Sequence, residues 1–334
     1  MKKWKTVLFI VIALAIALVF IFGIKISETT KTNAINIYRF EQSVFATNES
    51  RIDKDILEWR TYLGPFFESF NYEILRINSK QENYKEKLLQ FVSNPDMREA
   101  FDTLIKKYPN VDFLEKDLTI AFEKYKQYFP NKKTLTIITY FSGFNFGVVT
   151  NDTIVAIGLD YFLGKDCSFY KRLNSPEYMR NKNQKKFILP YCFEAIINNE
   201  FGIFDNGNDL LSQMIYKGKI MYLLDVILPQ FPDADKLRFS QTELNWCKEN
   251  ESNIWAYFID NEILYSSDIK KFNSYINYAP FAKGMPKESP GRISYWMGWN
   301  IVEAYMNKNK NTTIEQLMEN TNPQEVLRQS GYKP

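Results

Sequence analysis

The 334-residue sequence contains no histidine. A Ser/His/Asp triad, a Cys/His pair and a His-ligated catalytic zinc all need an imidazole group near neutral pH. Catalysis would therefore depend on carboxylate, tyrosine, lysine or arginine side chains. The absence of histidine favours a protein that binds over one that catalyses, and it predicts no zinc chemistry and no metal or other cofactor.

Cysteine is also scarce. Cys167, Cys192 and Cys247 are the three in the chain, and no C-x-x-C or zinc-type spacing occurs. An odd number in an oxidising compartment permits one disulfide and one free thiol, or three buried small side chains. Since no cysteine precedes Cys167, lipidation of the bacterial lipoprotein kind is not expected.

Charge of one sign is not in excess, because 42 basic and 39 acidic residues leave a net charge of +3. This balance indicates no nucleic-acid partner. Residues 165–186 are an exception, because basic residues outnumber acidic ones there. This stretch is either a solvated loop or a surface that contacts anionic headgroups or surface glycolipid. Its basic residues are Lys165, Lys171, Arg172, Arg180, Lys182, Lys185 and Lys186.

A long hydrophobic run is present at the N-terminus. Eighteen apolar residues, 7–24, would span about 27 Å as a helix, close to the hydrocarbon thickness of a bilayer. Lysines precede the run, which places that end in the cytoplasm. We expect an uncleaved single-pass transmembrane helix in the cell membrane, with the rest exported to the periplasm; the alternative is a signal peptide cleaved near Asn33-Ala34.

The domain organisation follows from this run. Residues 1–30 are expected to form the membrane anchor or signal segment, and residues 31–334 a single exported domain, because no Gly-, Pro- or Ser-rich linker divides them. The fold class predicted is α+β and predominantly helical. Aromatic content of 16% supplies bulk for a large core.

Residues 35–126 have helical periodicity, interrupted at Gly64-Pro65 and restarted at Asn94-Pro95. Residues 134–163 are rich in β-branched and aromatic side chains, which predicts two or three strands and a hairpin turning at Asn151-Asp152. Asp160 follows the last of these strands. Its carboxylate either caps a turn or points into a cleft.

The remainder is predicted to be helical. Asp209 is expected to cap a strongly apolar helix over residues 210–228, in preference to forming part of a calcium loop. Ser240 and Glu243 make a capping box. Further signals are Pro290 at a helix start, Gly291 and Gly298 placed for close helix contact, and a last helix from Asn322-Pro323 to Gly331.

Two stretches carry a family resemblance. They are IGLDYFLGKDCSFY at 157–170 and the C-terminal third, which includes LLSQMIYKGKIMYLLDVILPQFPDADK, WCKENESNIWAYFIDNEILYSSD and ESPGRISYWMGWNIVEAYM. In order and spacing these blocks resemble the GldB family of gliding-motility lipoproteins. The resemblance covers roughly residues 35–334. It implies an envelope protein needed for gliding and linked to type IX secretion, without established enzymatic activity and with outer-membrane association as one mode. The chain departs from the family in lacking the N-terminal cysteine that is typically lipidated.

The resemblance also implies a degenerate zincin-like domain. In a zincin, two histidines four residues apart on a helix bind zinc, and a glutamate between them is the general base. If helix 210–228 were that element, Ser212 and Tyr216 would replace the ligands and Gln213 the base. A neutral amide cannot accept a proton from water, so a zinc peptidase is excluded on this interpretation.

The function predicted is a non-catalytic, membrane-anchored scaffold or interaction component of the gliding and secretion apparatus. Its partners would be the bacterial membrane, envelope proteins of that machinery and the cell wall. A cell-wall glycan or peptide binding module is one alternative. A carboxylate-dependent hydrolase is another, and its candidate acids are Asp160, Glu194, Glu200, Asp205, Asp209 and Glu249.

Three surfaces are candidates for partner binding: the former substrate cleft with Asp160, the basic stretch with Arg172, Lys185 and Lys186, and the aromatic residues Trp296 and Trp299. The two tryptophans are either exposed contact residues or, as helical spacing favours, part of the core.

Overall fold

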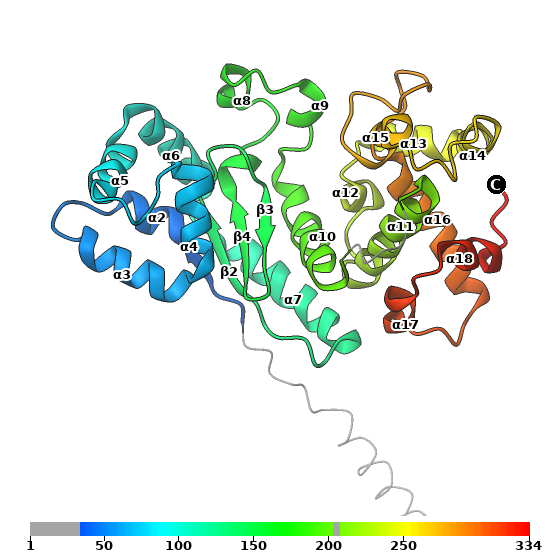
Figure 1. Cartoon of the computed structure of the whole chain (residues 1–334), viewed down its shortest axis with the longest axis horizontal. Coiled ribbons are helices and arrows are strands. Elements are labelled where there is room, and N and C mark those ends of the chain that lie inside the picture. The colour runs from blue at the N-terminus through cyan, green and yellow to red at the C-terminus, as the bar shows by residue number, and fades with distance from the viewer. Residues whose placement is uncertain (1–33, 203–207) are drawn as a thin grey trace, which may run out of the picture. The chain divides into compact units, whose positions relative to one another are not determined.

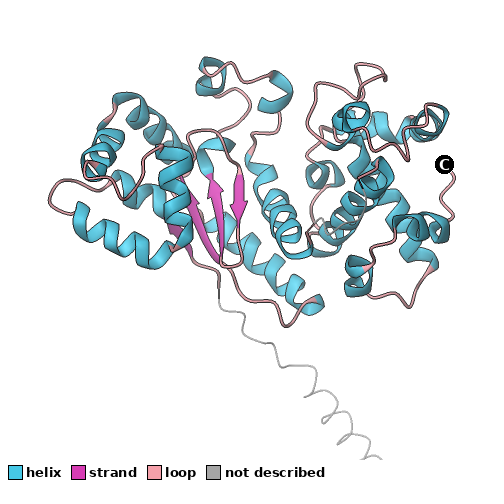
Figure 2. Ribbon diagram, in the orientation of Figure 1, coloured by secondary structure: helices cyan, strands magenta, loops and turns pink. Residues whose placement is uncertain are grey.

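The computed structural model describes residues 34–202 and 208–334. Within these ranges the protein is predominantly helical, with one small four-stranded sheet (Figures 1 and 2). Residues 35–334 form one compact unit. The structure describes one large domain in which the sheet contributes a minor part.

The sheet has the strand order β1-β2-β4-β3. Strands β1 (Ile37–Arg39), β2 (Thr136–Tyr140) and β4 (Ile154–Gly158) are parallel, and β3 (Val148–Thr150) pairs antiparallel with β4. All five residues of β4 are buried, which agrees with its apolar sequence IVAIG. The predicted hairpin is confirmed as β3–β4, where the Asn151 Oδ1 atom accepts from the Thr153 and Ile154 amides.

The N-terminal half is helical except for β1, which corrects the expectation of helices alone over residues 35–126. The break at Gly64-Pro65 is confirmed between α3 and α4, and the Asn94 side chain caps α6. The elements are α2 (Phe40–Phe45), α3 (Ile52–Leu63), α4 (Pro65–Phe70), η1 (Asn71–Leu75), α5 (Tyr84–Ser93), α6 (Pro95–Lys107) and α7 (Asp112–Tyr128).

Helices cover the sheet from both sides. Phe66 and Phe70 of α4 pack edge-on against Tyr140 of β2, with ring centroids 5.3 and 6.5 Å away. Helix α10 (Ile188–Phe201) packs beside β3 and β4, and its Phe193 contacts Phe122 of α7 at 5.0 Å. Figure 1 shows the sheet between α4 and α10.

Short helices follow the sheet and lead into α10. They are η2 (Leu159–Phe162), α8 (Ser168–Arg172), α9 (Glu177–Arg180) and η3 (Lys185–Phe187). The C-terminal half contains α11 (Leu210–Ile227), α12 (Asp233–Leu237), α13 (Gln241–Glu249), α14 (Glu251–Asp260), α15 (Ile269–Ile276), α16 (Ile293–Lys308), α17 (Ile314–Glu319) and α18 (Pro323–Ser330). The predicted caps at Asp209, Ser240 and Asn322 are confirmed.

Helices α11 and α16 cross at the centre of the C-terminal half. Gly218 of α11 faces Gly298 of α16, so closely that a β-carbon on either glycine would meet the other helix's backbone. Gly298 therefore has the close-contact role predicted for it. Gly291 instead packs against the backbone of Ala279, outside any helix.

One part of the predicted fold class is corrected. The sequence led us to expect a preceding transmembrane helix, whereas in residues 34–202 and 208–334 no helix has the length and apolar character needed to cross a membrane. The apolar run at 7–24 lies outside the described residues.

Candidate functional site

A buried carboxylate on α10 is the centre of a cluster of charged and polar side chains. Glu194 lies between Phe193 and Ala195 in the apolar sequence ILPYCFEAIINNEF, and its side chain is 8% exposed. Burying an ionised carboxylate is costly unless it is paired and hydrogen-bonded. The environment of Glu194 must therefore supply compensating charge.

Two arginines supply it. Arg292 Nη2 donates to Glu194 Oε1 at 3.0 Å and Oε2 at 3.1 Å, and Arg238 Nη2 forms a short ion pair with Oε2. The Tyr295 hydroxyl donates to Oε1 at 3.0 Å. The side chains of both arginines are 3% exposed. Both carboxylate oxygens of Glu194 therefore accept hydrogen bonds. The donors are Tyr295 on α16, Arg292 just before α16 and Arg238 just after α12.

Both arginines adopt a left-handed backbone, with φ of 57° at Arg238 and 62° at Arg292. For a residue with a β-carbon this conformation costs about 1–2 kcal/mol. Arg238 ends α12 and Arg292 precedes α16, so the unusual backbone turns each guanidinium inward at a helix end. The ion pairs with Glu194 offset this cost.

Tyrosine rings enclose the arginines. The Arg238 guanidinium carbon lies 4.0 Å from the centroid of the Tyr191 ring, and that of Arg292 lies 3.8 Å from Tyr295. Arg292 Nη1 also donates to the Tyr278 hydroxyl at 2.8 Å. Arg238 Nε and Nη1 are buried without a hydrogen-bond partner among the described residues. The cluster therefore contains more donor capacity and more positive charge than Glu194 satisfies.

The electrostatics hold Glu194 ionised. Burial raises its pKa, but Arg238 and Arg292, with smaller contributions from Lys217 and Tyr295, outweigh burial and lower the pKa to about 2. A carboxylate with so low a pKa is a weak base and does not hold a proton at neutral pH, so it is poorly suited to general acid–base catalysis.

Lys217 of α11 is the third cation near Glu194. Burial lowers its pKa to about 8; Glu194 opposes the shift, and Arg292 and Arg238 add to it. Its Nζ atom lies 5.4 Å from the centroid of the Tyr295 ring. Lys217 and Tyr295 line a cavity of about 480 Å³ beside the cluster, together with residues of α11, α15 and the segment after α15. Among the three cations of the cluster, Lys217 is therefore the one that lines the cavity.

The predicted degenerate metal-binding positions lie on α11. Ser212 is buried at its first turn, where its amide and hydroxyl bond Asp209 Oδ1 at 2.8 Å each. The Tyr216 hydroxyl donates to Asn198 Oδ1 at 3.1 Å, and Gln213 lines the Lys217 cavity. Within the described residues no group of three His, Cys, Asp or Glu side chains could hold a metal ion. The residues present do not fit a zincin-type zinc site.

Asp160 is fully buried and organises the loop after β2. Its carboxylate accepts from the amides of Ser142 at 2.8 Å and Phe144 at 2.6 Å, and from the Ser142 hydroxyl at 3.1 Å. Phe144 has a φ of 64°, a strained value that these bonds hold in place. Of the two roles considered for Asp160, the structure shows turn capping.

We expect Asp160→Asn to lower the free energy of unfolding by about 1–3 kcal/mol, because an amide nitrogen facing a backbone donor leaves a buried polar group unsatisfied. Urea denaturation of the full-length chain measures this change. Asp166→Asn is the control, since Asp166 is exposed and its carboxylate makes no hydrogen bond in the described structure. Equal stabilities of the two variants would contradict a capping role.

The other two predicted interaction surfaces are the tryptophans of α16 and the basic stretch 165–186. Trp296 is 4% and Trp299 is 8% exposed, so both belong to the core. In the basic stretch, Arg172 pairs with Glu99 at 2.9 Å, Lys186 with Asp235 at 2.6 Å and Lys182 with Glu243 at 3.1 Å. The Lys185 Nζ atom lies 3.4 Å from the Phe113 ring centroid. Much of the basic charge is therefore used within the domain.

The three cysteines are all free thiols. Cys192 and Cys247 are buried, and burial raises their pKa values above the ordinary range. Neither arrangement considered from the sequence is met in full, because no two cysteines are paired and Cys167 is only partly buried. Neither buried thiol is activated as a nucleophile.

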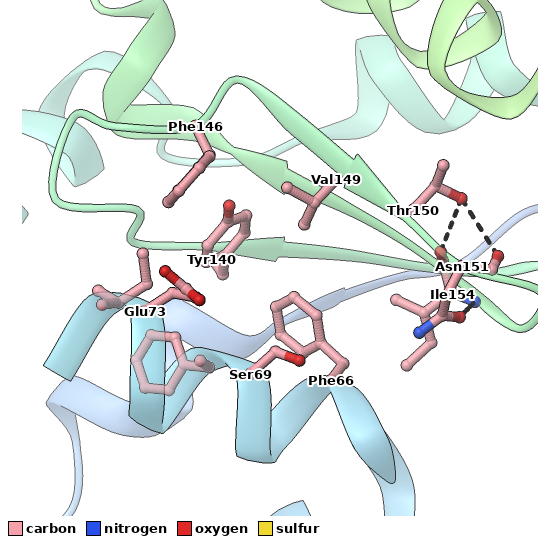
Figure 3. Close-up of a pocket in the computed structure, with 11 residues that line it drawn as sticks. Phe66, Ser69, Glu73, Tyr140, Phe146, Val149, Thr150, Asn151 and Ile154 are labelled. Atoms are coloured by element: carbon pink, nitrogen blue, oxygen red, sulfur yellow. Dashed lines mark hydrogen bonds between the residues drawn. The ribbon is translucent and has the colours of Figure 1, made fainter. Parts of the chain in front are cut away.

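A second hollow, of about 430 Å³, lies between α4–η1 and the sheet. Figure 3 shows Phe66, Ser69 and Glu73 on the helical side, facing Tyr140 and Val149 on the strands. Its walls are mainly aromatic and aliphatic side chains. The sequence offered no signal for this hollow, because its two walls are separated by more than sixty residues of chain.

Glu194 is one of six candidate acids in the sequence, and its position alone does not mark it as the centre of a site. Its hydrogen-bond partners lie 44, 98 and 101 residues away. The one usable signal was local: a single acid among apolar residues on a buried helix requires a counter-charge. Asp205, another of the six, lies outside the described residues.

The sequence of this domain was compared with models of known protein families. The family model described as gliding motility protein GldB matches residues 24–334. Because the match covers most of the chain, the protein belongs to the GldB family of gliding motility proteins. No curated protein and no solved structure matches the chain. The family is shown, whereas a relation to zincins has no support from a solved structure.

Family membership also corrects the expected localisation. GldB proteins are gliding-motility lipoproteins. The lipoprotein character of the family does not support the expected single-pass membrane anchor. No helix in the described residues could span a membrane.

Proposed function

We propose that this protein is a non-catalytic scaffold or interaction component of the gliding apparatus and its associated type IX secretion machinery. Membership of the GldB family supports the association with gliding. The observation that carries the non-catalytic part is the pairing of Glu194 with Arg238 and Arg292, which holds this buried carboxylate in a single ionised state. In this proposal the Glu194 carboxylate has a structural role and does not act as a general acid or base.

The proposal includes an origin from a zincin-like domain that has lost its metal-binding residues. On this view α11 is the former metal-binding helix, with Ser212, Gln213 and Tyr216 at the former metal positions. The absence of histidine from the whole sequence is consistent with the loss of the metal.

In-cell crosslinking of the tagged full-length chain, followed by mass spectrometry, tests the function. A photoreactive residue is placed at Ile269, which lines the Lys217 cavity and is 55% exposed. The matched control is Leu57 on α3, which is 66% exposed and lies in the N-terminal half. Gliding or secretion components enriched at Ile269 over Leu57, and over an abundance-matched envelope protein, support the proposal.

The second candidate is a binding module for wall glycan or peptide. The Lys217 cavity favours it, since peptide stems and termini carry carboxylates that a partly buried cation can bind. Retention of the protein on isolated peptidoglycan, competed by soluble fragments, together with no enrichment of gliding components, would establish this function in place of the first.

A further inference from the structure

The Glu194 cluster carries an excess of positive charge. Three cations, Arg238, Arg292 and Lys217, surround one carboxylate. Arg238 and Arg292 form ion pairs with Glu194, whereas Lys217 forms no ion pair with any described residue. A further cation, Lys182, is already paired with Glu243. When all four groups are ionised, three cations against one carboxylate leave the centre with an excess of two positive charges.

Lys217, the unpaired cation, lines a cavity whose other walls are polar but uncharged or apolar. Among the described residues that line the 480 Å³ hollow, Lys217 is the one charged side chain, and none of the rest is acidic. Gln213 and Asn277 provide amide groups, and Ile269, Phe272 and Ile276 form an apolar wall. A ligand that fits this lining has one negative group and an apolar body.

We propose that this cavity is a carboxylate-binding site, which takes a C-terminal or side-chain carboxylate of a partner peptide on Lys217 while the peptide's apolar part lies against α15. Lys217 would form the direct ion pair. Arg292 and Arg238, held beneath it by Glu194, would add a favourable field without contacting the ligand. A carboxylate on an apolar body fits better than inorganic phosphate, which finds one direct cation here and gains nothing from the apolar wall.

The orphaned donors of Arg238 give independent support. Its Nε and Nη1 atoms are buried and unpartnered among the described residues, although buried donors normally find a partner. An additional negative charge nearby would lower the electrostatic cost of keeping this guanidinium buried. The partner's chemistry follows from the cavity, and only its identity as a gliding component rests on the proposed function.

The purified full-length chain tests the site with defined probes. N-acetyl-L-phenylalanine carries a carboxylate on an aromatic body, and N-acetyl-L-phenylalaninamide is the same body without the charge. Saturation-transfer NMR and calorimetry are expected to show binding of the acid at pH 7 and at least tenfold weaker binding of the amide. Inorganic phosphate is the third probe and is expected to bind more weakly than the acid.

Lys217→Gln is expected to weaken binding of the acid at least tenfold. The variant should fold, because it removes a cation whose burial is unfavourable. Lys271→Gln on the exposed side of α15 is the matched control and should bind as the wild type does. Asn277→Asp, which adds a carboxylate to the cavity lining, should also abolish binding.

The pH dependence is a further readout on the unaltered protein. The groups facing Lys217 are Glu194 of α10, Arg238 after α12, and Arg292 and Tyr295 at the start of α16. With a Lys217 pKa of about 8 in the free protein, affinity for the acid should fall about tenfold between pH 7 and pH 9, as the cation is lost. Acid binding that persists in Lys217→Gln, equal binding of the amide, a preference for phosphate, or no binding at all would overturn the proposal. Crosslinking to gliding components could still succeed in each of those cases, so the two proposals fail separately.

Discussion

Glu194→Gln is expected to lower the free energy of unfolding at pH 7 by about 3–5 kcal/mol. The substitution keeps the shape of the side chain but leaves Arg238 and Arg292 buried without a counter-charge. Urea denaturation of the full-length chain measures the loss. Glu58→Gln on α3 is the control, because Glu58 is 60% exposed and its 3.6 Å pair with Lys54 lies at the surface.

The pH dependence of this difference has a defined sign. The folded pKa of Glu194 is about 2, against an ordinary value of 4.5, so the unfolded state binds more protons between these values. The stability that Glu194 contributes is complete above pH 4.5 and is lost as pH falls toward 2. The difference between wild type and Glu194→Gln should therefore shrink over that window. A difference that is small at pH 7, or constant down to pH 3, would contradict the ion-pair account.

Gly298→Ala is expected to lower the free energy of unfolding by about 3 kcal/mol, the upper end for overpacking. A β-carbon at Gly298 would overlap the Met214 carbonyl oxygen and lie 3.0 Å from the Gly218 amide nitrogen. Both are backbone atoms of α11, so neither can rotate away. Helix propensity alone predicts the opposite sign, a gain of about 1 kcal/mol.

Glu303→Ala is the matched control on the same helix, because Glu303 is exposed and the change improves helix propensity without entering the α11–α16 contact. Denaturation midpoints of the two variants decide between packing and propensity. Stabilisation by Gly298→Ala would mean that α11 and α16 separate easily, and that the glycine pair does not set their distance.

Local signals predicted many element boundaries. Asn94, Asp209, Ser240 and Asn322 each cap a helix as expected, because a side-chain oxygen reaches amides only two or three residues away. The β3–β4 turn at Asn151 is equally local. By contrast, β1 has three residues and exists through its parallel pairing with β2, a hundred residues later. A segment so short carries no periodicity of its own.

The candidate interaction residues show the same limit. Helical spacing placed Trp296 and Trp299 on α16 but could not decide whether their faces were covered. The basic stretch was visible as composition, whereas its pairing with Glu99, Asp235 and Glu243 depends on segments elsewhere in the chain.

The sequence by itself determined the absence of imidazole chemistry, the helical character, the caps and the family, because these depend on residue types and short spacings. Only the tertiary structure decided that Glu194 is the centre of a buried polar cluster. Its charge is compensated by Arg238 and Arg292, which chain folding brings to hydrogen-bond distance across 44 and 98 residues. Electrostatic compensation acts through space, and its partners are therefore set by packing and not by order in the chain.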